Sequence, residues 1–193
     1  MHRVIFGYLV AVFLVISILI YQPSVEGLLP NVIISLTTLQ LALMALQTKN
    51  GLLKLISVVG WFFLYPITFY QLFSVASVSW SGGSIWTAGD LPSFLTYLGC
   101  LLFALVAATT SMQSFMRVLK LKSHTQLAVM PIAAIYASLT VHVMRTANLG
   151  WMDFIVSPLI FFQKVFANMA TIDLTFLLGF AAIQMILPLI LSD

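Results

Sequence analysis

The sequence predicts an all-α protein, a polytopic membrane helix bundle, and three observations support that prediction. Of its 193 residues, 62% are hydrophobic and only 7% are charged. A soluble domain carries about 25% charged residues, because its surface has to stay hydrated. Apolar runs of about 20 residues, the length that crosses a bilayer as a helix, recur along the chain with turn signals between them. These features exclude a cytosolic enzyme, a nucleic-acid binder, a disordered chain and a disulfide scaffold.

Six spans are expected, and together they form a single integral membrane domain, 1–193. The first, at about 4–21, is longer than the apolar core of a signal peptide, and no small-residue cleavage site follows it, so we expect a retained anchor. Pro66 is expected to kink the third span. The other five spans run at about 29–47, 55–77, 94–116, 127–144 and 174–191.

The apolar stretch near 154–168 is ambiguous, because it is short and Lys164 interrupts it. Runs of 10–14 residues are more often interfacial, re-entrant or buried than spanning. Ser157-Pro158 is typical of a helix start, with serine as the cap and proline in the first turn. We expect a short interfacial or re-entrant helix here, and a seventh span is the alternative.

The distribution of basic residues predicts the orientation of the spans, because cytoplasmic loops are enriched in Lys and Arg. With six spans only Arg145 and Lys164 fall on the outer side. Both termini are then cytoplasmic. A seventh span would move only the C-terminal end, so this rule does not separate six spans from seven. The residues that share the cytoplasmic side are Arg3, Lys49, Lys54, Arg117, Lys120 and Lys122.

Two spans carry polar stripes. Polar side chains in hydrocarbon have to face other helices or a cavity, because an unsatisfied polar group there costs several kcal/mol. A kink beside Tyr65 and Gln71 would line a pocket that opens outward, and ordinary interhelical hydrogen bonds, worth about 0.6 kcal/mol each, are the alternative. The stripe on span two is Thr37, Gln40, Met44 and Gln47, and that on span three is Thr68, Gln71 and Ser74.

The outer end of span five concentrates chemically active residues. His142 and Arg145 are three residues apart and share a helix face, Asp153 follows, and Asp173 begins span six. Ionisable groups at such a boundary are candidates for function. Arg145 paired with Asp153 or Asp173 would fix the ends of the two spans. Alternatively, its planar guanidinium would bind the carboxylate or phosphate of a ligand.

Motifs of enzymes, metal sites and cofactor sites are not found. The chain has no H-E-x-x-H motif, no Walker loop and no cluster of metal-ligand residues, so no metal or cofactor is expected. The single cysteine, Cys100, lies in an apolar stretch and is expected to be buried. Small residues at four-residue spacing predict helix-packing faces on two spans. These residues are Ala104 and Ala108 on span four, and Ala133, Ala134, Ala137 and Ser138 on span five.

Two segments resemble the domain-of-unknown-function 1361 family of bacterial multi-pass membrane proteins. In 61–70, Trp61, Pro66 and a tyrosine match a tryptophan-led span with a Pro-Asn-Ala-Pro-Tyr type motif, although the asparagine and the second proline are missing. In 145–153, an arginine followed by Asn, Trp and Asp is similar to a later stretch of the family. The resemblance covers about residues 35–170. It implies a bacterial plasma-membrane location, and it supplies no activity, because the family has none assigned.

Three functions follow as hypotheses. The first is a non-enzymatic protein that binds, or helps to move, a small amphipathic or anionic molecule or lipid in an outward-facing pocket between spans two, three and five. The length and topology of the chain also look like those of the substrate-binding subunit of an energy-coupling-factor vitamin transporter, which works with a membrane-protein partner. The second is a structural or accessory subunit of a membrane complex. The third is an outer-leaflet lipid-modifying enzyme that uses Asp153 or Asp173. The pocket candidates are Gln40, Tyr65, Gln71, His142, Arg145, Asp153 and Asp173.

Overall fold

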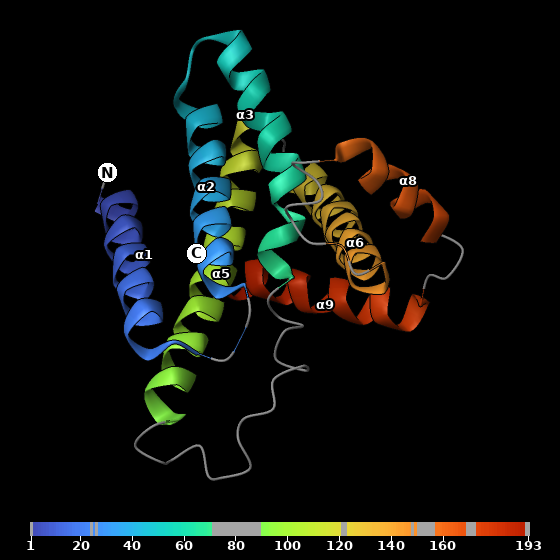
Figure 1. Cartoon of the computed structure of the whole chain (residues 1–193). Coiled ribbons are helices and arrows are strands. Elements are labelled where there is room, and N and C mark those ends of the chain that lie inside the picture. Colours follow the sequence, from blue (N-terminus) through green and yellow to red (C-terminus); the bar gives the residue numbers. More distant parts are fainter. Residues whose placement is uncertain are drawn as a thin grey trace. The chain divides into compact units, whose positions relative to one another are not determined.

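The computed structural model describes residues 2–23, 25, 27–70, 90–120, 123–147, 149, 157–168 and 173–191. These residues form seven α-helices and one 3-10 helix and contain no strand, which confirms the all-α prediction for the described part of the chain. The helices group into two compact units, Met1–Val118 and Leu119–Asp193 (Figure 1). The elements are α1 (His2–Tyr21), α2 (Leu28–Gln47), α3 (Gly51–Leu64), η1 (Pro66–Phe69), α5 (Asp90–Val118), α6 (Ser123–Thr146), α8 (Pro158–Asn168) and α9 (Leu174–Leu191).

Each predicted span coincides with a helix, although α5 and α6 begin four residues before the predicted starts at 94 and 127, and the third span differs at both ends. It begins at Gly51, four residues before the predicted start at 55, because the side chain of Asn50 caps it and accepts hydrogen bonds from the N–H groups of Leu52 and Leu53. The α-helix ends at Leu64 and continues as a 3-10 turn from Pro66. A proline has no N–H to donate to the preceding turn, so the α-helix stops here where the sequence predicted a kink. Residues 71–77 of the predicted span lie outside the described residues.

Four helical segments of the described chain are long and apolar enough to cross a membrane. They are Leu28–Gln47, Gly51–Phe69, Leu91–Val118 and Ala128–Thr146. The apolar stretches Ile5–Tyr21 and Leu174–Ile186 are shorter. Helix length and composition therefore support a membrane-embedded protein.

The helices of the first unit alternate in direction. Tyr8 of α1 contacts Gln40 of α2, and Ser93 near the start of α5 donates a hydrogen bond to the carbonyl of Tyr21 at the end of α1. The α2–α3 turn and the end of α5 therefore lie at one end of the unit, and α1 begins on the side of that end, beside α2 (Figure 1). Four basic residues of the first unit belong to these helix ends, namely Arg3, Lys49, Lys54 and Arg117. We call this end the basic end.

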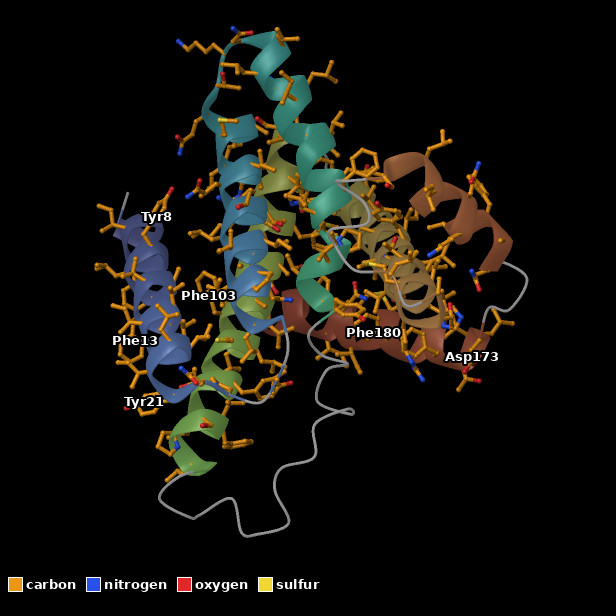
Figure 2. The ribbon with its side chains drawn as sticks, viewed as in Figure 1. Tyr8, Phe13, Tyr21, Phe103, Asp173 and Phe180 are labelled. Atoms are coloured by element: carbon orange, nitrogen blue, oxygen red, sulfur yellow. The ribbon has the colours of Figure 1, made fainter. Side chains whose placement is uncertain are left out.

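The core of the first unit lies where α2 and α5 pack together and α1 covers part of them. Leu14 of α1, Val32 of α2 and Cys100 of α5 belong to one buried cluster, so the thiol is buried as predicted. The absence of a side chain at Gly99 allows Leu14 to pack closely against α5, since a Cβ at Gly99 would lie 2.9 Å from the leucine side chain. The opposite face of α1 is apolar and exposed; Phe13 on this face is 67% accessible and points away from the unit (Figure 2). Such a face suits contact with lipid.

The second unit is built on the antiparallel pair α6 and α9. Ser138 contacts Gln184, and His142, one turn further along α6, contacts Phe176, which is two turns earlier in α9. Ala137 and Ser138, members of the predicted small-residue face, are fully buried. The short helix α8 begins at Pro158 directly after Ser157, which confirms the predicted helix start. Its 11 residues are too few to cross a bilayer.

Candidate functional site

Three of the predicted site residues gather around Phe176, at the junction between the end of α6 and the start of α9. The ring centroids of His142 and Phe176 are 5.4 Å apart. The guanidinium carbon of Arg145 lies 5.7 Å from the centre of the same ring. Asp173 precedes α9 and accepts a hydrogen bond from the Phe176 N–H at 3.2 Å. We call this group, with Phe176 at its centre, the α6–α9 junction.

Asp173 is the helix cap of α9. Its Oδ1 atom accepts hydrogen bonds from the backbone N–H groups of Thr175 at 2.9 Å and Phe176 at 3.2 Å. These donors belong to the first turn, where no intrahelical carbonyl is available to them. The negative charge of Asp173 also opposes the partial positive charge of the helix start. Its exposed position at the start of α9 is seen in Figure 2.

Arg145 is exposed in the last turn of α6 and lies over the Phe176 ring. A cation over an aromatic face gains about 0.5–1 kcal/mol at an exposed site. Within the described residues Arg145 and Asp173 form no ion pair, so the predicted pairing of these two residues is not formed. The physical reason is the capping geometry, which directs the carboxylate of Asp173 to the backbone of α9. The alternative partner, Asp153, lies outside the described residues.

His142 lies buried in the same junction and is only 4% accessible. Thr146, one turn later, donates a hydrogen bond from its hydroxyl to the carbonyl of His142 at 3.0 Å. Phe176 in turn stacks on Phe180, with ring centroids 5.6 Å apart. His142 is thus part of an aromatic cluster beneath Arg145. The sequence allowed His142 either a packing role or a chemical role, and this position supports the packing role.

Two residues of this region were missed at the sequence level. Phe176 was not considered, although an aromatic residue three positions after a capping aspartate lies in the first turn of α9. Gln184 was not considered either, although it is a polar residue in a long apolar span. Its Nε2 donates to Ser138 Oγ at 3.1 Å, and it is 3% accessible. Its Oε1 has no hydrogen-bond partner in the described residues.

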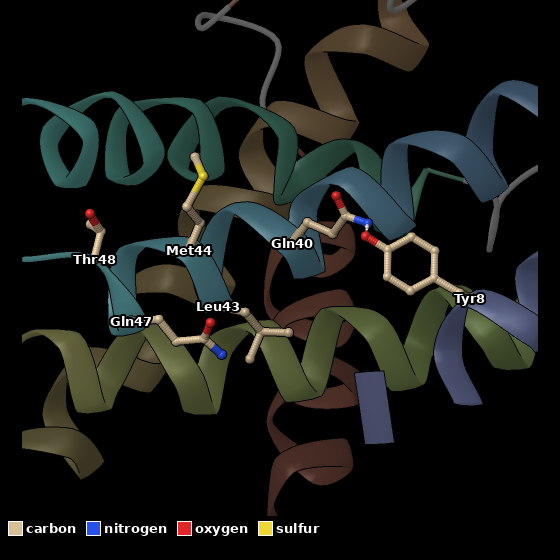
Figure 3. A pocket seen from close by; sticks show the side chains of 6 residues that line it. All are labelled: Tyr8, Gln40, Leu43, Met44, Gln47 and Thr48. Atoms are coloured by element: carbon tan, nitrogen blue, oxygen red, sulfur yellow. Dashed lines mark hydrogen bonds between the residues drawn. The ribbon is translucent and has the colours of Figure 1, made fainter. Parts of the chain in front are cut away.

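The first unit contains a groove of about 370 Å³ between α1 and the last two turns of α2. Gln40, Met44 and Gln47 of the predicted span-two stripe line it, which confirms that these residues share a face. Gln40 Nε2 donates a hydrogen bond to the Tyr8 hydroxyl (Figure 3). Tyr8 was not predicted as part of any site. The full lining is Tyr8, Gln40, Leu43, Met44, Gln47 and Thr48, and we call this site the α1–α2 groove.

This groove differs from the predicted pocket in its walls and in its position. The prediction combined span two with spans three and five and placed the opening at the outer side. The groove lies between α1 and α2, beside the end of α2 that leads to Lys49, so it lies near the basic end. The stripe has this position because Tyr8 of α1 meets Gln40 directly. The spacing of the stripe residues, in steps of three and four along α2, identified which face of the helix they share. The spacing contained no information on which helix packs beside that face.

Tyr65 takes part in packing and is not among the lining residues of the groove. It is 4% accessible, and its ring lies 4.7 Å from Trp61 and 5.4 Å from Phe69, centroid to centroid. Thr68 of the predicted span-three stripe donates its hydroxyl proton to the Tyr65 carbonyl at 2.6 Å. The Tyr65 carbonyl also accepts a hydrogen bond from the Thr68 backbone N–H at 3.3 Å, so the Thr68 hydroxyl is bonded within its own turn, which supports the structural alternative for this stripe at Thr68.

The remaining candidates are distributed as follows. Gln71 and Asp153 lie outside the described residues. Gln40 and Tyr65 belong to the first unit, and His142, Arg145 and Asp173 belong to the second. In the described ranges no group of three or more His, Cys, Asp or Glu side chains is placed to hold a metal ion.

Comparisons of the chain with protein-family models, with curated proteins and with solved structures found no match.

Proposed function

We propose that this chain is a multi-pass plasma-membrane protein that crosses the bilayer six times with both termini in the cytoplasm. Two observations support the proposal beyond the four long apolar helices. The basic residues of the first unit belong to helix ends at one end of that unit, as expected where cytoplasmic loops carry the Lys and Arg. The short helix α8 exposes Leu159 and Phe166 together with Lys164, a combination that suits the membrane surface. The family resemblance adds a bacterial membrane as the expected location.

The α6–α9 junction is proposed to bind a small amphipathic or anionic ligand at the outer side. The observation that carries this proposal is the state of Arg145. Its guanidinium is exposed, it lies over Phe176, and Asp173 is engaged with the backbone of α9. An arginine with its flat face on an aromatic ring still presents N–H groups at its edge to a carboxylate or phosphate.

The test compares Arg145→Gln with Lys164→Gln, because both cations are predicted at the outer side. Each full-length chain is purified in detergent, and the small molecules and lipids that copurify are identified by mass spectrometry. We expect the natural chain and the Lys164→Gln chain to retain the same anionic species, and the Arg145→Gln chain to lose it while its helix content stays unchanged. A natural chain that carries no such species would contradict the proposal.

A structural or accessory role in a membrane complex is the second candidate, and specific observations favour it. His142 is buried among aromatic rings, and Asp173 caps a helix, so two of the three junction residues already stabilise the fold. In that case Arg145→Gln would lower abundance and thermal stability instead of removing a ligand. The same experiment therefore separates the two functions.

An enzymatic role for Asp173 is the weakest candidate. A catalytic acid or base has to reach the reacting group of a substrate. The Oδ1 atom of Asp173 instead accepts two backbone hydrogen bonds, and these favour a fixed carboxylate. Asp153, the other candidate, lies outside the described residues.

A further inference from the structure

The exposed face of α2 carries polar groups from Thr37 to the end of the helix. Ile33, Thr37, Gln40, Met44 and Gln47 follow one another in steps of four and three residues, a spacing that keeps them on one side of a helix. Ile33, Thr37, Met44 and Gln47 are exposed, and Gln40 is half-buried. Carboxamides on a lipid-exposed helix face cost several kcal/mol when they lack partners. The last two turns of this face, which line the α1–α2 groove, therefore suit an occupant that can form hydrogen bonds.

The polar groups of the groove differ in how far they are satisfied. The Thr48 hydroxyl accepts a hydrogen bond from the Asn50 N–H at 3.3 Å, and Gln40 donates to Tyr8. Because the Tyr8 oxygen acts as acceptor there, its own proton remains to be donated. Gln47 has no hydrogen-bond partner in the described part of the chain. The groove therefore offers an amide at one end, a phenol at the other, and the apolar side chains of Leu43 and Met44 between them (Figure 3).

The depth of the groove matches the polarity profile of a membrane boundary. Gln47 is the last residue of α2, and Thr48 and Lys49 follow it outside the helix. At 1.5 Å per residue, Gln40 lies about 10 Å further along the helix axis. If Lys49 is at the membrane surface, the groove begins at headgroup level and extends into the hydrocarbon. A volume of about 370 Å³ is enough for part of an amphipathic ligand.

We propose that the α1–α2 groove binds an anionic phospholipid of the cytoplasmic leaflet. Its phosphate lies by Gln47, Thr48 and Lys49, an ester carbonyl accepts the Tyr8 proton, and the start of an acyl chain follows Leu43 and Met44. Charge complementarity selects the occupant, since the basic end attracts anionic headgroups at about 1 kcal/mol per Lys or Arg near the surface. A lipid with a neutral headgroup would gain none of this attraction. This inference rests on the membrane location and orientation proposed above, and it concerns a site separate from the α6–α9 junction.

The test measures phospholipid binding to the full-length chain by native mass spectrometry in detergent. The probes are phosphatidylglycerol and phosphatidylcholine, added separately. The chain carries Arg145→Gln, so that a ligand at the α6–α9 junction does not contribute. We expect phosphatidylglycerol to bind about tenfold more tightly than phosphatidylcholine, and Gln47→Leu and Lys49→Gln each to weaken it by about tenfold, because a hydrogen bond to a charged group is worth about 1.5–3 kcal/mol.

Lys54→Gln is the matched control, because it removes a cation from the same end of the unit, but from the first turn of α3, whereas Lys49 directly follows the lining residue Thr48. Equal weakening by Lys54→Gln and Lys49→Gln would overturn the proposal in favour of diffuse attraction. Equal binding of the two lipids would also overturn it. A Met44→Cys, Cys100→Ser chain that forms a disulfide-linked dimer in membranes would assign the groove to a second copy. Gln47→Leu, an apolar change on an exposed helix end, keeps the test decisive if the lysine variant is unstable.

The outcomes separate this inference from the proposed function. Loss of the anionic species only in the Arg145→Gln chain, with no lipid selectivity at the groove, refutes the inference and leaves the proposed function standing. Selective phosphatidylglycerol binding with no species dependent on Arg145 gives the reverse result. A chain that disperses in water without detergent refutes both.

Discussion

The α1–α2 groove and the α6–α9 pair use the same side-chain chemistry in opposite ways. Gln47 of the groove is exposed at the end of a helix, whereas Gln184 of α9 is buried and donates a hydrogen bond to Ser138 of α6. The Gln47 carboxamide faces outward and can bind a partner from outside the unit. The Gln184 carboxamide links two helices of one unit. The residue type alone therefore does not distinguish a binding surface from a packing contact, and burial decides between them.

The largest expected effect comes from Gln184→Ala. The variant removes the hydrogen bond to Ser138 and leaves a cavity between α6 and α9, so we expect a loss of about 2 kcal/mol of unfolding free energy. Gln184→Leu is the control. Leucine fills the same volume and removes the Oε1 atom, which has no hydrogen-bond partner among the described residues. The unfolding free energy of this variant is therefore expected to fall by less than about 1 kcal/mol. Thermal unfolding in detergent measures both, and an alanine variant as stable as the natural chain would contradict the contrast between the two amides.

The sequence predicted the helices well, because all but α8 are long apolar runs and the breaks carry clear signals. Asn50, within the turn signal at 48–51, caps α3, and α8 begins at Pro158 directly after Ser157. A hydropathy pattern indicates which segments are apolar enough to leave water. It contains little information on which helices pack together. Gln40 and Tyr8, for example, are 32 residues apart, and nothing in either local sequence relates them.

The candidate site was predicted in part for the same reason. The end of α6 and the start of α9 were expected to meet, and His142, Arg145 and Asp173 do gather there, around Phe176. Of the two expected partners of Arg145, Asp173 forms no ion pair with it, and Asp153 lies outside the described residues. Opposite charges suggested pairing, but a carboxylate directly before a helix has two backbone donors at hand, and these were closer partners. The cap was readable from the sequence, and the arginine's aromatic neighbour was not.

Asp173 gives the second prediction, of intermediate size. Asp173→Ala removes both hydrogen bonds to the start of α9 and is expected to lower the unfolding free energy by about 1 kcal/mol. Asp173→Asn keeps an acceptor oxygen and removes the charge, so its loss should be a few tenths of a kcal/mol. Unfolding in detergent, followed by circular dichroism, gives both values.

The pair of Asp173 variants distinguishes a cap from an ion pair. If a salt bridge held the α6–α9 junction, asparagine would be nearly as harmful as alanine, because both remove the charge. Retention of the Arg145-dependent ligand by Asp173→Asn would show in addition that this carboxylate neither binds the ligand nor acts in catalysis.

The smallest effect is expected at Thr37, which lies on the exposed face of α2 outside the groove. Its hydroxyl donates a hydrogen bond to the Ile33 carbonyl of its own helix at 2.8 Å, so it needs no partner from another chain. Thr37→Val keeps the shape of the side chain and removes the hydroxyl, and the carbonyl keeps its backbone bond. Stability should change by less than about 0.5 kcal/mol, and phosphatidylglycerol binding should not change at all.

Gln47→Leu is also an exposed polar-to-apolar change on this face. The two variants therefore have the same effect on surface polarity, and they differ in whether the changed residue contacts the groove. Equal loss of lipid binding in both would mean that the polarity of the whole face attracts the lipid, and the distinction between the groove and the rest of α2 would fail.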